Sequence, residues 1–441
     1  MLGSGNAGMA VTVETRKAGL SVAMAENREL GGTCPNRGCT PKKVMVAAGH
    51  ALGEIARAGG HCISVGKPRV DWAALIDREK ELISHLPASF AKLMADRGVD
   101  VVHERAVFAG PNAVRVGNRI LEAENIVIAT GSKPRRLPIE GAEHMITSDD
   151  ILSERTQPHE AVFVGGGVIA FEFAHVYARA GTRVTILEVL PRFLPALDQD
   201  AVTQIVHESK RIGITLITNV KVKRIEGRGA GRVAVLYEHE GAEQTLEADR
   251  VVNGAGRVAD VDTLDLQAGN VRLRDGRIDL DPYMRSVSNQ AVYVCGDALW
   301  SSPQLSPVAT YEGRIVGRNI VEGAKEKPDY SCIPSCVFTV PALASVGLTE
   351  AKAKESGQKV KVETNDMSDW MSSRTYNESA WAKVIYDDRS GRILGAQLAG
   401  HAAEELIHIF AFAIKFGITA NDIRETVYAF PTFSNDIKSL V

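Results

Sequence analysis

Short apolar runs alternate with helical stretches over most of the chain. Near the start, a helical stretch continues to about Ala18, and the apolar run Leu20–Ala25 follows it and is closed by the acidic Glu26. Apolar runs of this length that alternate with helices are typical of strands in a parallel sheet. The pattern therefore predicts an α/β fold.

The same plan returns 162 residues later. Strands are predicted at Ala161–Val164 and Arg183–Leu187, a helix between them reaches about Ala180, and Glu188 ends the second strand. Each copy also opens its helix with a glycine-rich turn, which contains Gly3, Gly5 and Gly8 in the first copy and Gly165, Gly167 and Ala170 in the second.

The spacing within the two copies is equal, because Glu26 follows Gly3 by 23 positions and Glu188 follows Gly165 by 23. Glycines let the backbone approach a pyrophosphate, the helix N-terminus offers N–H groups to it, and the acid accepts ribose hydroxyls. One such motif is weak evidence, but two at equal pitch predict two dinucleotide sites and electron transfer between them.

Two further buried strands end in small residues. They lie in residues 125–132, which contain Ala129-Thr130-Gly131, and in residues 291–298, which contain Cys295-Gly296-Asp297. From about Tyr330 the pattern changes, and strands at Ala380–Tyr386 and Ile393–Leu398 with a helix at 402–416 predict a module without a nucleotide motif.

The first glycine turn is preceded only by Met1 and Leu2. We therefore expect the strand that normally feeds such a turn to be missing, because either the start codon lies further upstream or the chain is truncated. On this expectation, binding at the first site is weaker than its motif suggests.

Composition narrows the class of protein. The 441 residues are 45% hydrophobic and 24% charged, with a net charge of -3, so the chain is long enough for several cores and has no basic footprint for nucleic acid. No apolar run reaches the ~18 residues of a membrane span. Six cysteines without a signal peptide predict a reducing compartment, the cytosol.

Cys34 and Cys39 carry the most informative chemistry. On a regular helix, five positions span roughly 7.5 Å of rise, beyond the Cα separation of about 4.4 to 6.8 Å that a disulfide accepts. The backbone must bend between them, which Pro35, Gly38 and Pro41 permit. So small a loop adds little stability, which favours redox chemistry over a structural disulfide. Half of a metal site and two inert buried thiols remain the alternatives.

These motifs together resemble the flavin-dependent pyridine nucleotide-disulfide oxidoreductases, the family of glutathione reductase, dihydrolipoamide dehydrogenase and mercuric reductase. The resemblance rests on the segment from Gly32 to Lys43, on the two strands that end in small residues, and on Phe338–Glu350, which is similar to the start of the family's dimerisation domain. It covers nearly the whole chain.

The resemblance implies a fold and an activity. The fold has two Rossmann-like domains, for FAD at residues 1–150 and 281–329 and for NAD(P) at 151–280, with a C-terminal α+β dimerisation domain at 330–441. The activity transfers electrons from NAD(P)H through FAD to a Cys34–Cys39 disulfide and then to a disulfide or another acceptor, in a homodimer.

The resemblance also implies roles for residues. Cys39 would lie against the flavin as the charge-transfer thiolate, Cys34 would attack substrate, and Lys43 would pair with Glu172 near the flavin. The implied cofactor-binding residues are Gly3, Gly5, Gly8, Glu26, Thr33, Lys43, Ala106, Thr130, Gly131, Asp297 and Ala309 for FAD, and Gly165, Gly167, Ala170, Glu188 and Gly256 for the nicotinamide dinucleotide. No metal site is predicted.

Local charges agree with the redox reading. A thiol pKa falls near cations and helix N-termini, and Arg37, Lys42 and Lys43 surround the pair at the head of a helix predicted to begin near Lys42. We read Arg37 itself as a solvated loop charge. Glu188 favours NADH, since it would bind a free 2′-hydroxyl and repel a 2′-phosphate, and only Arg192 lies close behind it.

The family pattern fails near the C-terminus. Disulfide reductases of the family carry His-Pro-Thr-x-x-Glu, in which the His of the partner subunit is the acid–base catalyst and the Glu orients it. Here Phe430 and Asn435 replace them. Tyr428, interpreted as a buried structural tyrosine, is the nearest candidate to substitute for the His. An acceptor that needs no thiol protonation, such as a quinone or a metal ion, or a non-catalytic flavin- or nucleotide-binding role, is the alternative.

The remaining cysteines and two histidines receive structural interpretations. Cys332 and Cys336 could form a second redox pair but are read as structural, and Cys62 and Cys295 as packing thiols. His401 and His408, expected seven apart on one helix, are read as surface or interface residues.

Overall fold

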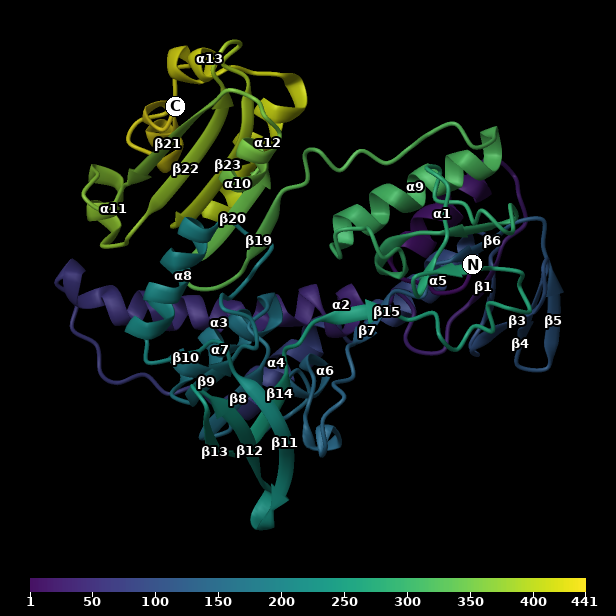
Figure 1. Cartoon of the computed structure of the whole chain (residues 1–441), viewed down its shortest axis with the longest axis horizontal. Coiled ribbons are helices and arrows are strands. Elements are labelled where there is room, and N and C mark those ends of the chain that lie inside the picture. Colours follow the sequence, from purple (N-terminus) through teal and green to yellow (C-terminus); the bar gives the residue numbers. More distant parts are fainter. The chain divides into compact units, whose positions relative to one another are not determined.

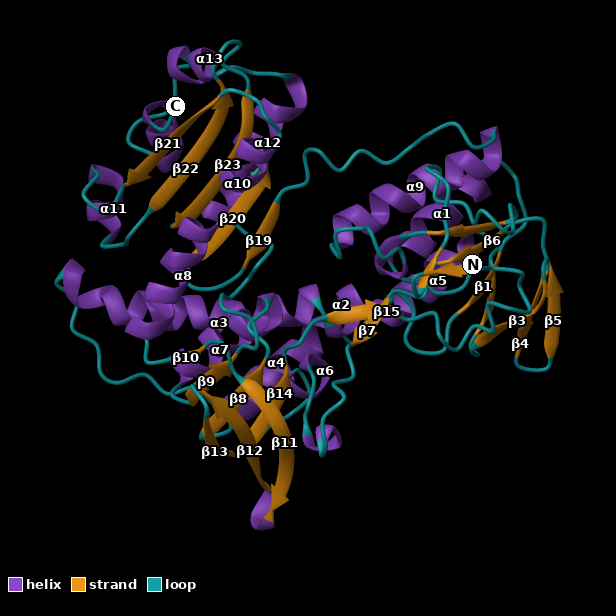
Figure 2. Ribbon diagram, viewed as in Figure 1, coloured by secondary structure: helices purple, strands orange, loops and turns teal.

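A computed structural model describes residues 1–441, apart from the side chain of Ala230. The chain divides into two compact units, and Figures 1 and 2 show their helices and strands. Unit 1 contains residues 1–43, 76–135 and 257–329, and unit 2 contains 44–75, 136–256 and 330–441. Helices α3 (Cys39–Arg57) and α4 (Trp72–Ile83) have residues in both units. The three predicted modules with their boundaries stay a prediction.

Unit 1 is built on a parallel sheet, in which β1 pairs with β2 and β18 with β6. The strands of this sheet are β1 (Ala23–Ala25), β2 (Asp100–Val102), β6 (Ile126–Ile128) and β18 (Val292–Val294). A second, antiparallel sheet contains β3 (Ala106–Gly110), β4 (Ala113–Val116) and β5 (Arg119–Glu122), and two short strand pairs are β7 (Ser132–Pro134) with β15 (Arg257–Ala259) and β16 (Leu273–Arg274) with β17 (Arg277–Ile278). The helices of unit 1 are α1 (Asn6–Lys17), α2 (Thr33–Arg37), α5 (Leu86–Asp96) and α9 (Ser306–Glu322).

The N-terminus has no strand before α1, as expected, but Leu2 occupies the place of one. Leu2 forms parallel bridges to Ile128 and to Ala25, so it stands between β6 and β1 in the centre of the sheet. Its N–H donates to the carbonyl of Val127 at 2.9 Å, and its carbonyl accepts from Ala129 at 2.9 Å. One extended residue can bond to both neighbouring strands, so Leu2 leads into the glycine turn from within the sheet.

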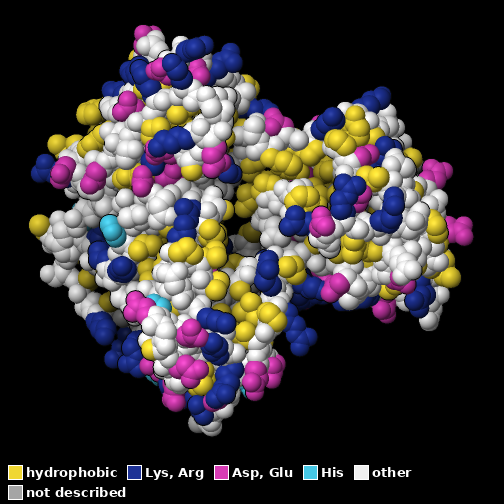
Figure 3. Space-filling model, viewed as in Figure 1, with side chains coloured by type: hydrophobic (Ala, Val, Ile, Leu, Met, Phe, Trp, Pro, Cys, Tyr) yellow, Lys and Arg dark blue, Asp and Glu magenta, His cyan; other side chains and the backbone are white. Residues whose placement is uncertain are grey.

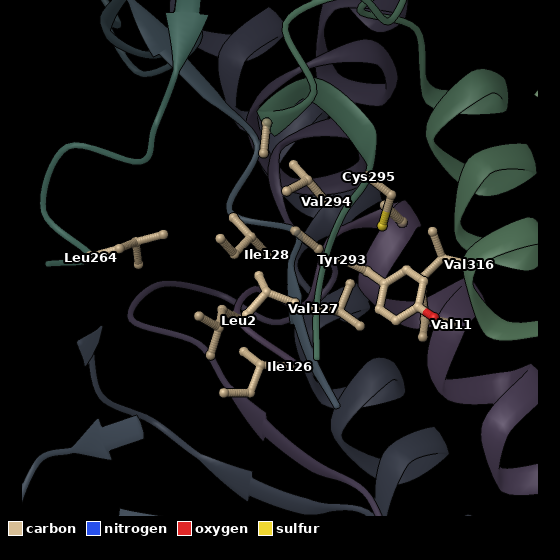
Figure 4. Close-up of a cluster of buried hydrophobic side chains, with 14 of the residues drawn as sticks. Leu2, Val11, Ile126, Val127, Ile128, Leu264, Tyr293, Val294, Cys295 and Val316 are labelled. Atoms are coloured by element: carbon tan, nitrogen blue, oxygen red, sulfur yellow. The ribbon is translucent and has the colours of Figure 1, made fainter. Parts of the chain in front are cut away.

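The core of unit 1 lies between this sheet and its helices. Figure 4 shows the ring of Tyr293 from β18 beside Val11 of α1 and Val316 of α9, and these three side chains are buried in one cluster with Leu2 and Val127. Helices α1 and α9 approach closely, because a Cβ on Gly313 of α9 would lie 2.4 Å from the Ala7 carbonyl oxygen. This packing fixes the start of α9 beside the first glycine turn.

Unit 2 contains a parallel sheet in the order β10-β9-β8-β14 and two antiparallel sheets. The parallel strands are β8 (Glu160–Val164), β9 (Arg183–Leu187), β10 (Thr215–Ile217) and β14 (Arg250–Asn253). The first antiparallel sheet contains β11 (Lys221–Arg228), β12 (Arg232–His239) and β13 (Ala242–Ala248). The second contains, in spatial order, β19 (Ser335–Val337), β20 (Ala342–Gly347), β23 (Ile393–Gly400), β22 (Trp381–Asp387) and β21 (Val360–Asp366). The helices are α6 (Ser148–Ile151), α7 (Val168–Ala180), α8 (Gln199–Arg211), α10 (Glu350–Glu355), α11 (Met371–Tyr376), α12 (Ala403–Phe416), α13 (Ala420–Glu425) and α14 (Phe433–Asp436).

The predicted elements are recovered with shifted ends. The second copy is reproduced most closely, since β9 and α7 end where the pattern places them. The apolar run that begins at Leu20 shortens to β1, because Leu20 is 39% exposed and lies in the turn after α1. His401 lies before α12 rather than on it.

The visible face of the molecule carries basic and acidic side chains intermixed (Figure 3). No described helix combines the length and apolar character that crossing a membrane requires.

Candidate active site

The two cysteines of the predicted redox pair stand on two successive helices. Cys34 lies in α2, Gly38 breaks the helix with φ -138° and ψ -112°, and Cys39 is the first residue of α3. The bend required by the spacing is therefore confirmed, but the second helix begins at Cys39 and not near Lys42. Cys39 thus lies at a helix N-terminus, where the dipole favours a thiolate.

Both thiols are free, and their environments differ. The pKa of the Cys39 thiol is lowered to about 6, chiefly by a hydrogen bond from Cys34. The Ser306 hydroxyl and the charge of Lys42 lower it further. The same hydrogen bond, with burial, raises the pKa of Cys34. At neutral pH the pair therefore holds one thiolate, on Cys39, and one thiol, on Cys34.

Ser306 is the residue at this site that the sequence did not reveal. It begins α9, and its Oγ lies 3.3 Å from Cys39 Sγ. No spacing or motif links the two positions, which are 267 residues apart. The serine reaches the cysteine only because α9 packs on α1.

Arg37 corrects an expectation. Its side chain is 14% exposed and forms an ion pair with Glu29, so it is not a solvated loop charge. Lys43 is exposed, and its predicted pairing with Glu172 stays a prediction. Glu172 itself is buried on α7 and accepts a hydrogen bond from the Phe338 N–H at 2.9 Å.

The first glycine turn is closed by backbone contacts that exclude side chains. A Cβ on Gly3 would lie 2.3 Å from the Ala129 carbonyl oxygen, and one on Gly8 would lie 2.2 Å from the carbonyl oxygen of Gly3. Gly32 lies against the same turn, since its Cβ would be 2.6 Å from Gly5 Cα. The turn therefore meets the segment that carries the cysteines.

Glu26 closes the first nucleotide site at the end of β1. Its carboxylate accepts from the N–H and hydroxyl of Ser4, at 3.0 and 2.7 Å, and from the Arg28 N–H at 2.9 Å. Ser4, inside the glycine motif, is a second residue that the sequence interpretation missed, although its place in the motif was a usable signal. These bonds hold the carboxylate at the position predicted for a ribose.

Polar groups at the ends of β6 and β18 fit the flavin that the motifs predict. Thr130 Oγ1 is buried without a hydrogen-bond partner among the described residues. Asp297 is half-buried, burial raises its pKa, and it accepts from Ser132 Oγ at 2.9 Å. Arg257 in turn donates to Ser132 Oγ at 2.8 Å. An orphaned hydroxyl and a carboxylate with spare acceptor capacity suit the hydroxyls and amides of FAD.

The other predicted flavin-site residues lie in unit 1 as well. Thr33 is exposed at the start of α2, Ala106 is buried at the start of β3, and Ala309 is buried in α9. Gly131 adopts a φ of 73° with open space at its Cβ position. Their roles stay predictions.

The second glycine turn stands in unit 2 at the end of β8. A Cβ on Gly165 would lie 2.5 Å from the backbone of Gly254, so the turn and the end of β14 touch. Glu188 accepts from the Gly166 N–H at 2.5 Å and from the Leu190 N–H at 2.8 Å. Gly167 caps α7 and Ala170 is buried in it, whereas Gly256 has open space around it.

The C-terminal segment keeps the substitutions found in the sequence. Phe430 is 78% exposed, and the Asn435 N–H donates at 3.1 Å to Thr432 Oγ1, which caps α14. Tyr428 is only half-buried, its hydroxyl donates to the Ile423 carbonyl at 3.3 Å, and burial raises its pKa. None of these three provides a base at neutral pH.

The remaining cysteines separate by burial. Cys295 is fully buried, as expected of a packing thiol, whereas Cys62 is exposed, and the packing interpretation of Cys62 is wrong. It lies in the turn after α3, where no core exists to cover it. Cys332 donates to the Ala411 carbonyl at 3.1 Å, and it packs with Cys336 against the core of the last sheet. Among the described residues, no group of three or more metal-ligating side chains could hold a metal ion.

Comparison with known proteins decides the family. Residues 1–313 match the family model for pyridine nucleotide-disulphide oxidoreductase, and residues 333–441 match the model for the dimerisation domain of that family. The chain belongs to this family. It is therefore an FAD-dependent oxidoreductase that uses NAD(P)H, and the predicted family, fold class and class of cofactor are confirmed.

Individual members of the family cover almost the whole chain. The dihydrolipoyl dehydrogenase of Bacillus subtilis is 33% identical over 98% of this chain and 93% of its own length. The mercuric reductase of Staphylococcus aureus is 29% identical over 99% of this chain and 80% of its own. A solved Cu(II) complex of the HOCl-induced flavoprotein disulfide reductase RclA from Escherichia coli has a TM-score of 0.88 and 28% identity, covering 99% of this chain and 97% of that one.

Proposed function

We propose that this oxidoreductase uses NADH to reduce a disulfide substrate through Cys34 and Cys39. The unequal pair carries the proposal, because Cys39 stands at the N-terminus of α3 with Ser306 Oγ 3.3 Å away, and the hydrogen bond between the thiols lowers the Cys39 pKa and raises that of Cys34. Bound FAD supplies the relay, accepting a hydride from NADH and passing the electron pair on. Cys34 then forms a mixed disulfide with substrate, and the Cys39 thiolate displaces the second substrate sulfur as the Cys34–Cys39 disulfide closes.

The preference for NADH rests on the end of β9. The Glu188 carboxylate is held by two backbone N–H groups, where it accepts ribose hydroxyls and repels a 2′-phosphate. Arg192, the nearest arginine behind it in sequence, donates to the carbonyls of Pro195 and Leu197 at 2.6 and 2.7 Å. Its guanidinium is thus engaged by backbone and is poorly placed to bind a phosphate.

A homodimer and a cytoplasmic location belong to the same proposal. The dimerisation-domain match is supported by large apolar side chains on the surface of that domain: Phe412 and Phe416 of α12 are 61% and 73% exposed, and Val427 is 95% exposed. A partner copy would cover them. A cysteine pair that cycles between dithiol and disulfide is typical of a reducing compartment.

A soft metal ion is the second candidate acceptor. Two observations favour it: Phe430 and Asn435 replace the family's acid–base pair, and the similar RclA structure is a Cu(II) complex. Two Cu(II) ions would each take one electron from the dithiol, the Cys34–Cys39 disulfide would form, and the Cys34 proton would leave. This reaction has no leaving thiolate to protonate.

Anaerobic titration of the purified protein tests the proposal. We expect NADH to bleach the bound flavin and to raise the count of reactive thiols by two, faster than NADPH does, and the Cys34→Ala variant to lose the thiol increase. Turnover is then measured with oxidised lipoamide and with Cu(II). A protein that holds no flavin after reconstitution, or that reduces Cu(II) but no disulfide, would overturn the proposed disulfide reductase.

A further inference from the structure

The helix that carries Cys34 is too short to hold itself in place. Helix α2 has five residues, its N-cap is Gly32, and no side chain caps it. Gly38 ends it directly before Cys39. A single helical turn is unstable by itself, because its formation fixes several residues for very few hydrogen bonds. The position of the Cys34 thiol therefore depends on the contacts that hold the residues before α2.

Hydrogen bonds hold these residues on two sides. On one side, Asn36 Nδ2 donates to the carbonyls of Leu30 and Gly32 at 3.0 and 2.9 Å. On the other side, the N–H of Gly31 donates to Ser4 Oγ at 3.2 Å. Asn36 belongs to α2, so it ties the helix to the residues before it. Ser4 in turn ties those residues to the first glycine turn.

The backbone has to make these contacts, because side chains do not fit here. Gly31 and Gly32 have φ values of 98° and 72°, in the left-handed region that favours glycine. A Cβ on Gly31 would lie 2.5 Å from the ring of Phe90, and one on Gly32 would lie 2.6 Å from Gly5 Cα. The buried N–H of Gly31 thus provides an anchor that no side chain at its position could replace.

The hydroxyl of Ser4 is an acceptor and a donor at the same time. It is fully buried, accepts from Gly31, and donates to the carboxylate of Glu26 at 2.7 Å. A hydroxyl that donates to a charged acceptor becomes a better acceptor itself. Glu26 lies at the position predicted for the ribose of FAD. One hydroxyl therefore joins the ribose carboxylate to the residues that hold Cys34.

We propose that Ser4 is a positioning residue that couples Glu26 to the Cys34–Cys39 pair. This rests on the proposed function, which gives the pair its redox role. A disulfide requires the two sulfurs to lie about 2 Å apart, whereas the dithiol tolerates a wider separation. A firmly held α2 therefore favours the disulfide, and a loosened α2 favours the dithiol. Because such coupling is reciprocal, a ribose bound at Glu26 and a closed disulfide stabilise each other.

The equilibrium between dithiol and disulfide in the holoenzyme tests this. In mixtures of reduced and oxidised dithiothreitol, the protein pair gives two electrons and two protons to oxidised dithiothreitol as its own disulfide forms. We expect Ser4→Ala to lower the equilibrium constant for disulfide formation by about 10-fold, because the N–H of Gly31 loses its acceptor. Alkylation followed by peptide mass spectrometry counts the Cys34 and Cys39 thiols.

Thr12→Val is the matched control. Thr12 carries a buried hydroxyl on α1 that has no hydrogen-bond partner among the described residues, so its loss should leave the equilibrium unchanged. Glu26→Gln weakens the acceptor of the Ser4 hydroxyl and leaves the residues before α2 intact. It should shift the equilibrium in the same direction as Ser4→Ala, by about threefold. In the double variant the two shifts should not add, because both act through one hydrogen-bonded connection.

Several outcomes would overturn the coupling. These are an unchanged equilibrium in Ser4→Ala protein that binds FAD, an equal shift in Thr12→Val, or additive shifts in the double variant. If Ser4→Ala does not fold, Glu26→Gln alone decides, and an unchanged equilibrium there counts against Ser4. The mixtures contain neither NADH nor an electron acceptor. A parent protein that NADH cannot reduce would therefore contradict the proposed function and not this inference.

Discussion

Ser306 Oγ lies 3.3 Å from Cys39 Sγ, at the meeting point of the N-termini of α9 and α3. The hydroxyl lowers the Cys39 pKa together with the Cys34 thiol, Lys42 and a backbone hydrogen bond. The arrangement assigns the negative charge of the reduced pair to Cys39 and leaves the proton on Cys34.

Replacing Ser306 should raise the thiol pKa of Cys39 above its value of about 6. A hydrogen bond to a charged group contributes about 1.5 to 3 kcal/mol, and Ser306→Ala removes it. Titrating the thiolate by its ultraviolet absorbance in the reduced protein measures the change. Ser301→Ala, exposed in the preceding loop, should titrate like the parent protein.

Two substitutions at Cys34 distinguish its role as a hydrogen-bond donor to Cys39 from its role as the nucleophile. Cys34→Ser keeps a donor for the Cys39 thiolate, so the low pKa should persist, and Cys34→Ala should raise it because the largest contribution is lost. Both variants should lose disulfide turnover. Thiolate titrations that agree between the two variants would show that Cys34 does not set the charge on Cys39.

Glu188 should decide between the two nicotinamide dinucleotides. Glu188→Ser removes the acceptor for the ribose hydroxyls, and we expect kcat/KM for NADH to fall by about 10-fold while that for NADPH falls less or rises. Steady-state rates with both dinucleotides give the ratio of kcat/KM for NADH to kcat/KM for NADPH. Glu243→Ser, exposed on β13, is the control. An unchanged ratio would remove the basis for the NADH preference.

Arg257 should support the flavin site through Ser132. Its bond to Ser132 Oγ orients the hydroxyl that donates to Asp297, and its charge offsets part of the burial that raises the Asp297 pKa. We expect Arg257→Gln to raise that pKa further and to weaken FAD retention by about 10-fold, measured as flavin fluorescence released on dilution. Arg274→Gln, which is exposed and paired with Asp279, should retain FAD normally.

Among the cationic side chains, Lys383 should lower the free energy of unfolding most when it is replaced. Its side chain is 2% exposed and its Nζ lies 3.0, 2.7 and 2.7 Å from Asp198, Asp200 and Glu350. Lys383→Met removes the cation shared by three carboxylates, of which Glu350 keeps Lys354 as a partner. We expect the free energy of unfolding to fall by about 3 to 5 kcal/mol, seen as a lower urea midpoint. Lys354→Met, on the exposed side of Glu350, should cost less than about 1 kcal/mol.

The destabilisation caused by Lys383→Met should depend on pH, because the pKa values of Lys383 and Glu350 shift in opposite directions. Burial disfavours charged Lys383, but its three hydrogen bonds outweigh this and raise its pKa, so its contribution is lost only as the pH rises far above neutral. Lys354 and Lys383 lower the pKa of Glu350, whose contribution is present above the ordinary glutamate pKa and lost as the pH falls. The difference between parent and Lys383→Met should therefore shrink in acid.

Sequence alone determined the features that local backbone geometry demands. Glycine turns, the acids 23 positions behind them, and the bend between Cys34 and Cys39 each lie within some thirty residues, where the chain's own stereochemistry fixes the pattern. The α/β class and the family followed from these segments. Leu2 between its two strands went unforeseen because a single residue shows no periodicity.

Tertiary structure alone decided which side chains meet across long separations. Ser306 with Cys39 and Arg257 with Ser132 come together through helix packing and strand pairing. Spacing carries no record of such contacts, because loops of any length can connect the elements that bring them together. The motifs therefore identified the redox chemistry, and the fold determined which groups hold its charge and its protons.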